Sequence, residues 1–221
     1  MNTHGFLDQL LKTAQQSVGD LTGGKGIGGD FGKGALAGGA LGLLLGNRRV
    51  RKMGGKVAMY GGLAAVGALA YKAYGDWKQQ QAGAGAASAA PQTFDALPPA
   101  EIESHSQAIL KALIAAAKAD GHVDDRERQV IEGEFSRLEA APEVRQWLQA
   151  ELQKPLDPAE VARAASSPEM ASEMYLASLL AVDEQNFMER AYLDELARQL
   201  KLDDGLKARL EQQMKEAGDA V

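Results

Sequence analysis

The sequence predicts an all-α protein, in which a glycine-rich, membrane-associated N-terminal part precedes a soluble bundle of about seven helices. Residues 1–90 contain 21 of the 25 glycines, and two apolar stretches lie in that half. Beyond residue 99, apolar residues recur every three or four positions, which is the period of a helix. The alternating pattern of a strand does not occur there.

Charge divides the chain into the same two halves. Residues 1–90 carry 10 Lys and Arg against 4 Asp and Glu, whereas residues 91–221 carry 14 against 26. The net charge of −6 therefore combines a basic half with an acidic half. Because an acidic surface repels polyanions at long range, we expect no nucleic-acid partner. The chain has no cysteine, so disulfides, thiolate zinc sites and thiol nucleophiles are excluded.

Residues 1–33 are expected to form an amphipathic helix followed by a glycine-rich linker. Apolar side chains fall at helical spacings between residues 4 and 18, from Phe6 to Val18. Such a helix would lie on a membrane surface or dock on a partner, or it would be a frayed helical start. Residues 19–33 have the composition of a flexible linker.

Residues 34–75 form the membrane-associated region. The first stretch, Gly34 to Asn47, would be roughly 21 Å long as a helix, which is short of the ~30 Å hydrocarbon core. The second, Val57 to Tyr74, would be roughly 27 Å long, and its one charge is Lys72 near the end. We therefore expect one transmembrane helix over residues 57–75, with lipid as its surroundings.

Small residues recur every four positions in both stretches. Such ladders let helix backbones approach closely in lipid, and they predict helix–helix packing within the chain or in a homo-oligomer. In water each of these glycines would weaken a helix by about 1 kcal/mol relative to alanine. The alternative is a disordered glycine-alanine tract. The packing residues are Gly34, Gly38, Gly42, Gly46, Gly54, Ala58 and Gly62.

Basic residues between the two stretches predict an orientation. Five cations lie between Arg48 and Lys56, immediately before the second stretch. The positive-inside rule then places residue 50 in the cytoplasm and the C-terminal domain on the other side of the membrane.

Residues 76–98 read as a flexible linker and residues 99–217 as the helical domain. Capping residues and prolines mark the expected helix starts. A nearly all-apolar helix around Met174 to Leu180 is expected at the centre. The start signals are Asp124 with Glu127, Pro142, Asp157-Pro158, Ser167-Pro168, Asn186 with Glu189, and Asp203 or Asp204.

The stretch from Ile109 to Leu138 contains an apolar helix that ends in Ala-Asp-Gly, followed by His122, Val123, Asp124 and, at position 127, a Glu that begins the next helix. This pattern resembles the TerB-like (tellurite-resistance) helical family over roughly residues 100–215. With its N-terminal segment, the whole chain resembles the YebE-type inner-membrane proteins of that group. The resemblance implies two related halves with acidic junctions, a bacterial inner-membrane location and, for some members, a divalent-metal site.

Residues of the first junction that match the family pattern are Asp120, Asp124 and Glu127, and those of the second are Asp183 and Glu189. The second copy departs from the pattern, because no glycine follows Asp183 and the Asp-to-Glu spacing is six. Clustered carboxylates suit hard cations such as Mg²⁺ or Ca²⁺. Helix capping and a turn explain the first junction equally, so no cofactor is required.

Catalysis is not expected. The three histidines are His4, His105 and His122; His105 reads as a helix-surface residue, and no pair has metal-ligand spacing. Two roles remain open. One is a non-enzymatic, membrane-anchored interaction or sensing module, with an unidentified protein partner and a possible link to metal or envelope stress. The other is a membrane-structural protein whose glycine ladders self-associate, with the helical domain as a cap.

Overall fold

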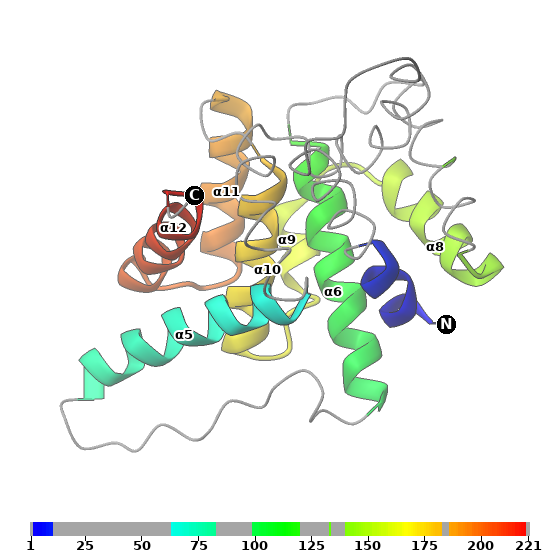
Figure 1. The fold of residues 1–221 in the computed structure, drawn as a ribbon. Helices are drawn as coiled ribbons and strands as arrows, with labels where there is room; N and C mark the ends of the chain where they lie inside the picture. The colour runs from blue at the N-terminus through cyan, green and yellow to red at the C-terminus, as the bar shows by residue number, and fades with distance from the viewer. Residues whose placement is uncertain are drawn as a thin grey trace, which may run out of the picture.

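The computed structural model describes residues 2–10, 63–82, 99–119, 140–182 and 186–219, together with Gly133. These residues are helical and contain no strand, so the all-α prediction is confirmed for them (Figure 1). None of their helices is long and apolar enough to cross a membrane. The helices are residues 3–10, α5 (Leu63–Ala82), α6 (Pro99–Ala117), α8 (Pro142–Gln153), α9 (Pro158–Ala162), α10 (Pro168–Ala181), α11 (Phe187–Gln199) and α12 (Asp204–Asp219).

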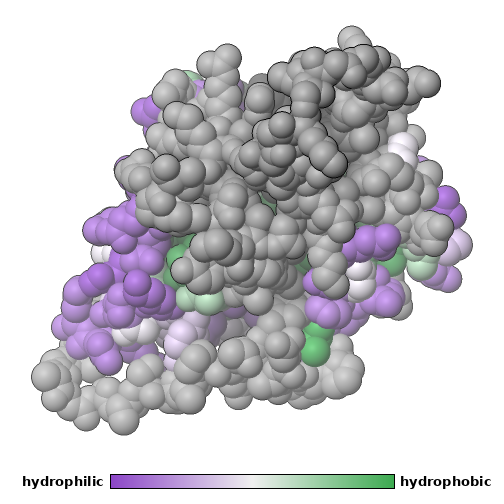
Figure 2. Space-filling model, in the orientation of Figure 1, coloured by the Kyte–Doolittle hydropathy of each residue, from purple (hydrophilic) through white to green (hydrophobic). Residues whose placement is uncertain are grey.

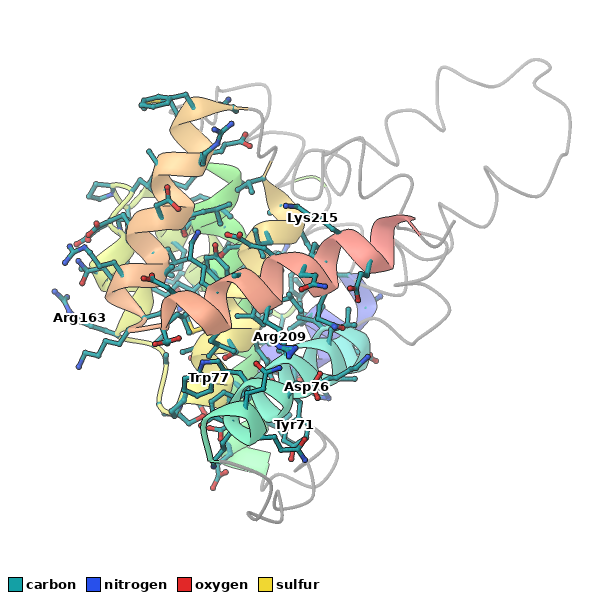
Figure 3. All side chains as sticks on the ribbon, turned by 90° about the vertical axis from the view of Figure 1, so that its left-hand side faces the viewer. Tyr71, Asp76, Trp77, Arg163, Arg209 and Lys215 are labelled. Carbon is teal, nitrogen blue, oxygen red and sulfur yellow. The ribbon has the colours of Figure 1, made fainter. Side chains whose placement is uncertain are left out.

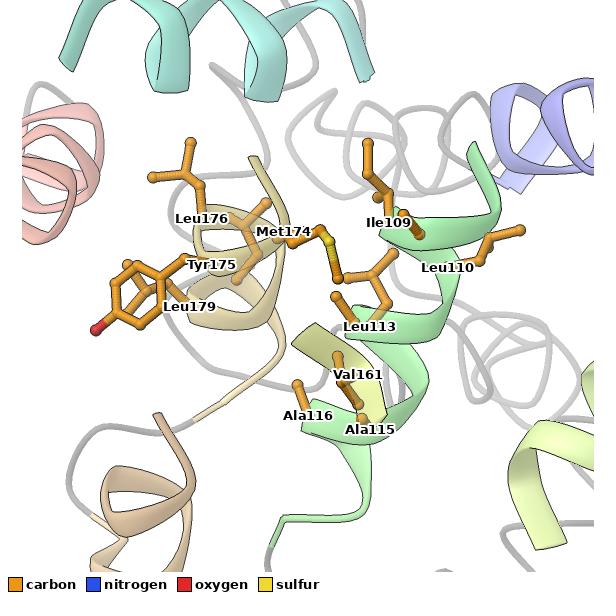
Figure 4. Close-up of a cluster of buried hydrophobic side chains, with 14 of the residues drawn as sticks. Ile109, Leu110, Leu113, Ala115, Ala116, Val161, Met174, Tyr175, Leu176 and Leu179 are labelled. Atoms are coloured by element: carbon orange, nitrogen blue, oxygen red, sulfur yellow. The ribbon is translucent and has the colours of Figure 1, made fainter. Parts of the chain in front are cut away.

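Helix α10 lies at the centre of the bundle, as the sequence predicts. It contacts α5, α6, α11 and α12, and every residue from Met174 to Leu180 is buried. A helix that is apolar on all sides has to be covered on all sides. Figure 4 shows this arrangement, with Met174 pointing toward α6, Tyr175 toward α12 and Leu176 toward α5. The described surface in Figure 2 is mainly hydrophilic.

Side-chain caps start four helices where the sequence predicts them. The Asp157 carboxylate accepts a hydrogen bond from the Ala159 N–H at 2.9 Å, and Ser167 Oγ accepts from the Met170 N–H at 3.1 Å. Asn186 Oδ1 accepts from the Met188 N–H at 2.9 Å. For the last helix, Asp203 rather than Asp204 provides the cap, because its Oδ1 accepts from the Gly205 N–H at 2.8 Å. Each cap satisfies a backbone donor that the helix itself cannot. The expected helix at Asp124 lies outside the described residues.

The helix at residues 3–10 packs against the bundle through its apolar face. Phe6, Leu7 and Leu10 are buried, and Figure 1 shows this helix beside α6. Over residues 3–10, the apolar face for which the sequence analysis considers a membrane or a partner therefore packs against the protein itself.

Helix α5 combines segments to which the sequence assigns different roles. The sequence predicts a spanning helix to residue 75 and a linker from residue 76, whereas α5 continues through this point to Ala82. It packs along α10 and α12, and Val66, Ala70 and Ala73 are buried. Their spacing of four and three residues places them on one face of the helix.

The end of α11 contains a non-glycine residue with a positive φ. Lys201 has φ 57°, the Leu202 N–H donates to the Ala197 carbonyl at 3.0 Å, and the Lys201 N–H donates to the Arg198 carbonyl at 3.1 Å. This is the Schellman arrangement, in which glycine is favoured because a Cβ is strained in the left-handed region.

Replacement of Lys201 by glycine is therefore expected to stabilise the protein by about 0.5–1 kcal/mol, since relief of the left-handed strain exceeds the added entropy of the unfolded chain. Urea unfolding followed by circular dichroism measures the change. Lys201→Ala, which keeps the Cβ, serves as the control and should leave stability nearly unchanged. A destabilised Lys201→Gly protein would contradict the argument.

Candidate functional site

The residues predicted to bind metal are mostly beyond the described part of the chain. Asp120, Asp124, Glu127 and Asp183 lie outside it, as do all seven residues of the glycine ladders. Within the described ranges, no group of three or more His, Asp or Glu side chains is arranged to hold a metal ion. The metal site remains a prediction.

Glu189 is the one predicted metal ligand that the structure describes. It lies in the first turn of α11, directly after the Asn186 cap. A carboxylate at this position is stabilised by the positive end of the helix dipole, so the helix start alone accounts for its presence.

The same turn of α11 exposes two large apolar side chains. Phe187 is 79% exposed and Met188 is 54% exposed. Aromatic residues and methionine are enriched in protein interfaces, and methionine adapts its shape to different partners. This exposed pair adjoins the second acidic junction in the sequence, so the start of α11 offers an apolar contact next to that junction.

His105 is buried, and the expectation that it lies on a helix surface is wrong. It is 9% exposed, and its Nε2 atom contacts Glu173 Oε2, which joins α6 to α10. The backbone of α5 passes close by, since a Cβ added to Gly67 would lie 3.5 Å from Glu173 Oε1. This position on α6 therefore lies between helices rather than in solvent.

Glu103 of α6 caps the N-terminal helix from outside. Its Oε1 atom accepts hydrogen bonds from the Thr3 N–H at 2.9 Å and the Thr3 hydroxyl at 2.6 Å, and its Oε2 atom accepts from the His4 N–H at 3.3 Å. Partial burial acts to raise the pKa of Glu103, but these hydrogen bonds outweigh it and hold the pKa below its usual value.

Glu103→Gln is expected to destabilise the protein by about 1 kcal/mol near neutral pH, because the charge-assisted hydrogen bonds are lost. A carboxyl whose pKa is lowered by folding stabilises the folded state above its unfolded pKa, near 4.5, and loses this contribution as the pH falls. The difference between the two proteins should therefore shrink below about pH 4. Urea unfolding near neutral pH and below about pH 4 measures this difference in stability. Glu143→Gln, at an exposed carboxylate, is the control. A difference independent of pH would contradict the assignment.

A shallow recess between α6, α8 and α9 contains a cluster of lysines and carboxylates. The recess is lined by the last turns of α6, the end of α8 and the start of α9. Lys111 pairs with Glu160 at 2.5 Å, and Lys154 pairs with Glu151 at 2.5 Å and with Glu160 at 3.6 Å. Lys118 donates to the backbone carbonyls of Glu151, at 3.2 Å, and Lys154.

The charges of this cluster offset one another only in part, since three lysines face two carboxylates. Burial lowers the pKa of Lys118, although Glu151 acts in the opposite direction. For Glu160, burial acts to raise the pKa, but the hydrogen bond from Lys111 and the charge of Lys154 lower it overall. Each of these groups has a partner within the cluster. The cluster therefore fixes α6 to the end of α8 and the start of α9.

Helix α5 forms an interface with α10 and α12. The indole Nε1 of Trp77 donates to Asp203 Oδ1 at 3.2 Å, and a Cβ added to Gly205 would lie 3.6 Å from the Trp77 ring. Figure 3 shows α5 beside α12, with Trp77 near the start of α12. Tyr74 lies against Trp77 with ring centroids 5.7 Å apart. Aromatic side chains therefore hold the end of α5 that is farther from the glycine-rich segment.

Comparison with known proteins assigns the chain to a family. The model of the family described as "Protein of unknown function (DUF533)" matches residues 30–214. The chain belongs to the DUF533 family. A Yersinia enterocolitica protein described as "Uncharacterized protein in ampR 5'region" is 32% identical over 122 residues, which cover 55% of this chain and 88% of that relative. No solved structure matches the chain significantly.

The DUF533 match extends over both halves of the chain. It begins before the first apolar stretch, includes α5 and ends within α12. The glycine-rich segment and the bundle thus belong to one DUF533 unit, in agreement with the packing of α5 on the bundle.

Sequence reasoning missed most of the polar contacts in this DUF533 protein. Lys111 and Lys118 are seven residues apart, which places them on one face of α6, but a lysine face is usually solvated. Their partners, Glu160 and Glu151, lie 49 and 33 residues away in the chain. The Phe-Met pair after Asn186 was a detectable signal, because an N-cap followed directly by two apolar residues is more apolar than the usual first turn of a helix.

Proposed function

We propose that this protein is a membrane-anchored, non-enzymatic interaction module. The glycine-rich apolar segment at residues 34–75 holds the chain in a bacterial inner membrane, and the helical bundle binds a protein partner. The observation that carries this proposal is the exposed pair Phe187 and Met188 at the start of α11. The anchor is expected from the apolar segment, which continues into α5. Through α5, the anchor and the bundle are directly connected.

The exposed pair Phe187 and Met188 supports a partner site at the start of α11. Apolar side chains of this size lose unfavourable contact with water when a partner covers them. Positive charge before the second apolar stretch favours a periplasmic position for the bundle.

A sensing role would use the acidic junctions. Mg²⁺ or Ca²⁺ bound by Asp120, Asp124 and Glu127, or near Asp183 and Glu189, would alter the start of a helix next to the partner site. An envelope stress that changes divalent-metal levels would then change partner binding.

Crosslinking in native membranes, followed by capture of the full chain, tests the partner site. We expect a crosslinked protein that is retained by Leu156→Ser, in which another exposed apolar residue is removed, and lost in the Phe187→Ser, Met188→Ser double variant. Equal capture by both variants would contradict the proposed site. A chain that crosslinks only to itself through the glycine ladders would favour the membrane-structural alternative.

Calorimetric titration of the full chain in detergent tests the metal component. Heat on addition of Mg²⁺ or Ca²⁺ is expected to disappear when Asp124 is replaced by asparagine. No heat at about millimolar metal, the weak end of calcium sites, would remove the metal from the proposal.

A further inference from the structure

Helix α5 packs on α10 and α12. Its buried face consists of Val66, Ala70 and Ala73, and its far end is fixed by the hydrogen bond from Trp77 to Asp203. Small side chains allow a close approach of the helices, but they bury little apolar surface. The docked position of α5 therefore depends on the close packing of small side chains, to which the partly buried Leu69, Tyr74 and Trp77 add.

The same residues belong to the stretch that the sequence assigns to the bilayer. Of residues 57–75, only the first six precede α5, and six helical residues span roughly 9 Å, less than a third of the ~30 Å hydrocarbon core. Residues 34–56 do not offer a substitute, since Gly34 to Asn47 is too short and four cations lie between Arg48 and Lys52. A complete span therefore requires the first half of α5.

The docked position of α5 excludes the inserted one. Gly67 lies beside Glu173, which pairs with His105, and Trp77 is bound to Asp203. These ionisable groups belong to an acidic, hydrophilic bundle, which cannot follow α5 into hydrocarbon. Residues 66–73 thus contact either the bundle or lipid at any one time.

From this exclusion we infer that α5 has two alternative positions, docked on α10 and α12 or inserted in the bilayer, and that insertion uncovers the bundle surface that α5 occupies here. This inference rests on the proposed membrane anchor. Leu176 of α10 points toward α5 and is fully buried, so departure of α5 would expose an apolar surface of the bundle (Figure 4).

Cysteine labelling of the full chain in phosphatidylethanolamine–phosphatidylglycerol vesicles tests the inference, because the native chain has no cysteine. Ala68 is exposed when α5 is docked and would lie near the centre of the span when it is inserted. We expect a water-soluble, membrane-impermeant maleimide to label Ala68→Cys several-fold more slowly than Ala208→Cys. Ala208 is exposed on α12 and stays with the bundle in either position, so it corrects for vesicle sidedness.

A second substitution should shift the equilibrium between the docked and the inserted position of α5. Ala73 is fully buried on the face of α5 that contacts the bundle. Ala73→Leu enlarges this side chain, so it should weaken docking and reduce labelling of Cys at position 68 by a further fivefold or so. Gly75→Leu is the matched control, since a Cβ at Gly75 meets nothing within 4 Å and leaves docking intact.

The outcomes distinguish the proposed membrane anchor from the inferred exchange of α5 between two positions. Flotation with the vesicles and protection of position 68 support both. Flotation with equal labelling at positions 68 and 208 overturns the inference and leaves the anchor in place. A chain that does not float overturns the anchor, and with it the inference.

Discussion

Leu176→Ala is expected to destabilise the protein by about 3 kcal/mol. Leu176 is fully buried in the central helix α10 and points toward α5, so its truncation removes apolar contacts and leaves a cavity between elements that cannot collapse freely (Figure 4). Urea unfolding of the full chain in detergent, followed by far-UV circular dichroism, measures the loss.

Leu156→Ala provides the control for this measurement. Leu156 lies between α8 and α9 and is 37% exposed, so the same chemical change should cost far less, roughly 0.5 kcal/mol or below. Equal effects of the two substitutions would show that α10 is not the centre of the bundle.

Glu173→Ala is expected to cost about 2–3 kcal/mol. It removes the carboxylate that His105 Nε2 contacts, and with it a polar contact between α6 and α10 at a buried position. Because Glu173 also lies next to Gly67, hydrogen exchange in α5 should rise together with the loss of global stability. Exchange unchanged in α5 would contradict the proximity of α5 to this pair.

A double-mutant cycle with His105→Ala separates the pair from its surroundings. We expect a coupling energy of about 1–2 kcal/mol between the two positions. Glu216→Ala, an exposed carboxylate on α12, is the control for the removal of a negative charge and should change stability by less than about 0.5 kcal/mol. Additive effects of His105→Ala and Glu173→Ala would argue against a direct interaction.

Local features of the fold were predictable because their causes are local. Asp157, Ser167 and Asn186 each cap a helix that starts at the next residue, and the all-apolar pattern of α10 requires burial whatever surrounds it. The position of α5 was not predictable in this way. Glycine and alanine permit close packing both in lipid and against a protein, so composition does not identify the neighbour.

The buried polar contacts depend on residues far apart in the chain. His105 reads as a surface residue until Glu173, 68 positions away, is placed beside it, and Glu103 reads as an ordinary helix carboxylate until Thr3, 100 positions away, is bound to it. Helical periodicity identifies which residues share a face, but it does not identify what covers that face. The first acidic junction stays a prediction, since Asp120, Asp124 and Glu127 lie outside the described residues.

The hydrogen bond between Trp77 and Asp203 connects residues 126 positions apart, which has a consequence for the order of events during synthesis. At ribosomal rates of about 5–20 residues per second, α5 leaves the ribosome roughly 6–25 s before the start of α12 is made. During that interval its docking surface is incomplete, because α12 has not been made, whereas a membrane insertion machinery at the ribosome would be present from the beginning. With the proposed anchor, the apolar segment would therefore meet the bilayer before the bundle is complete.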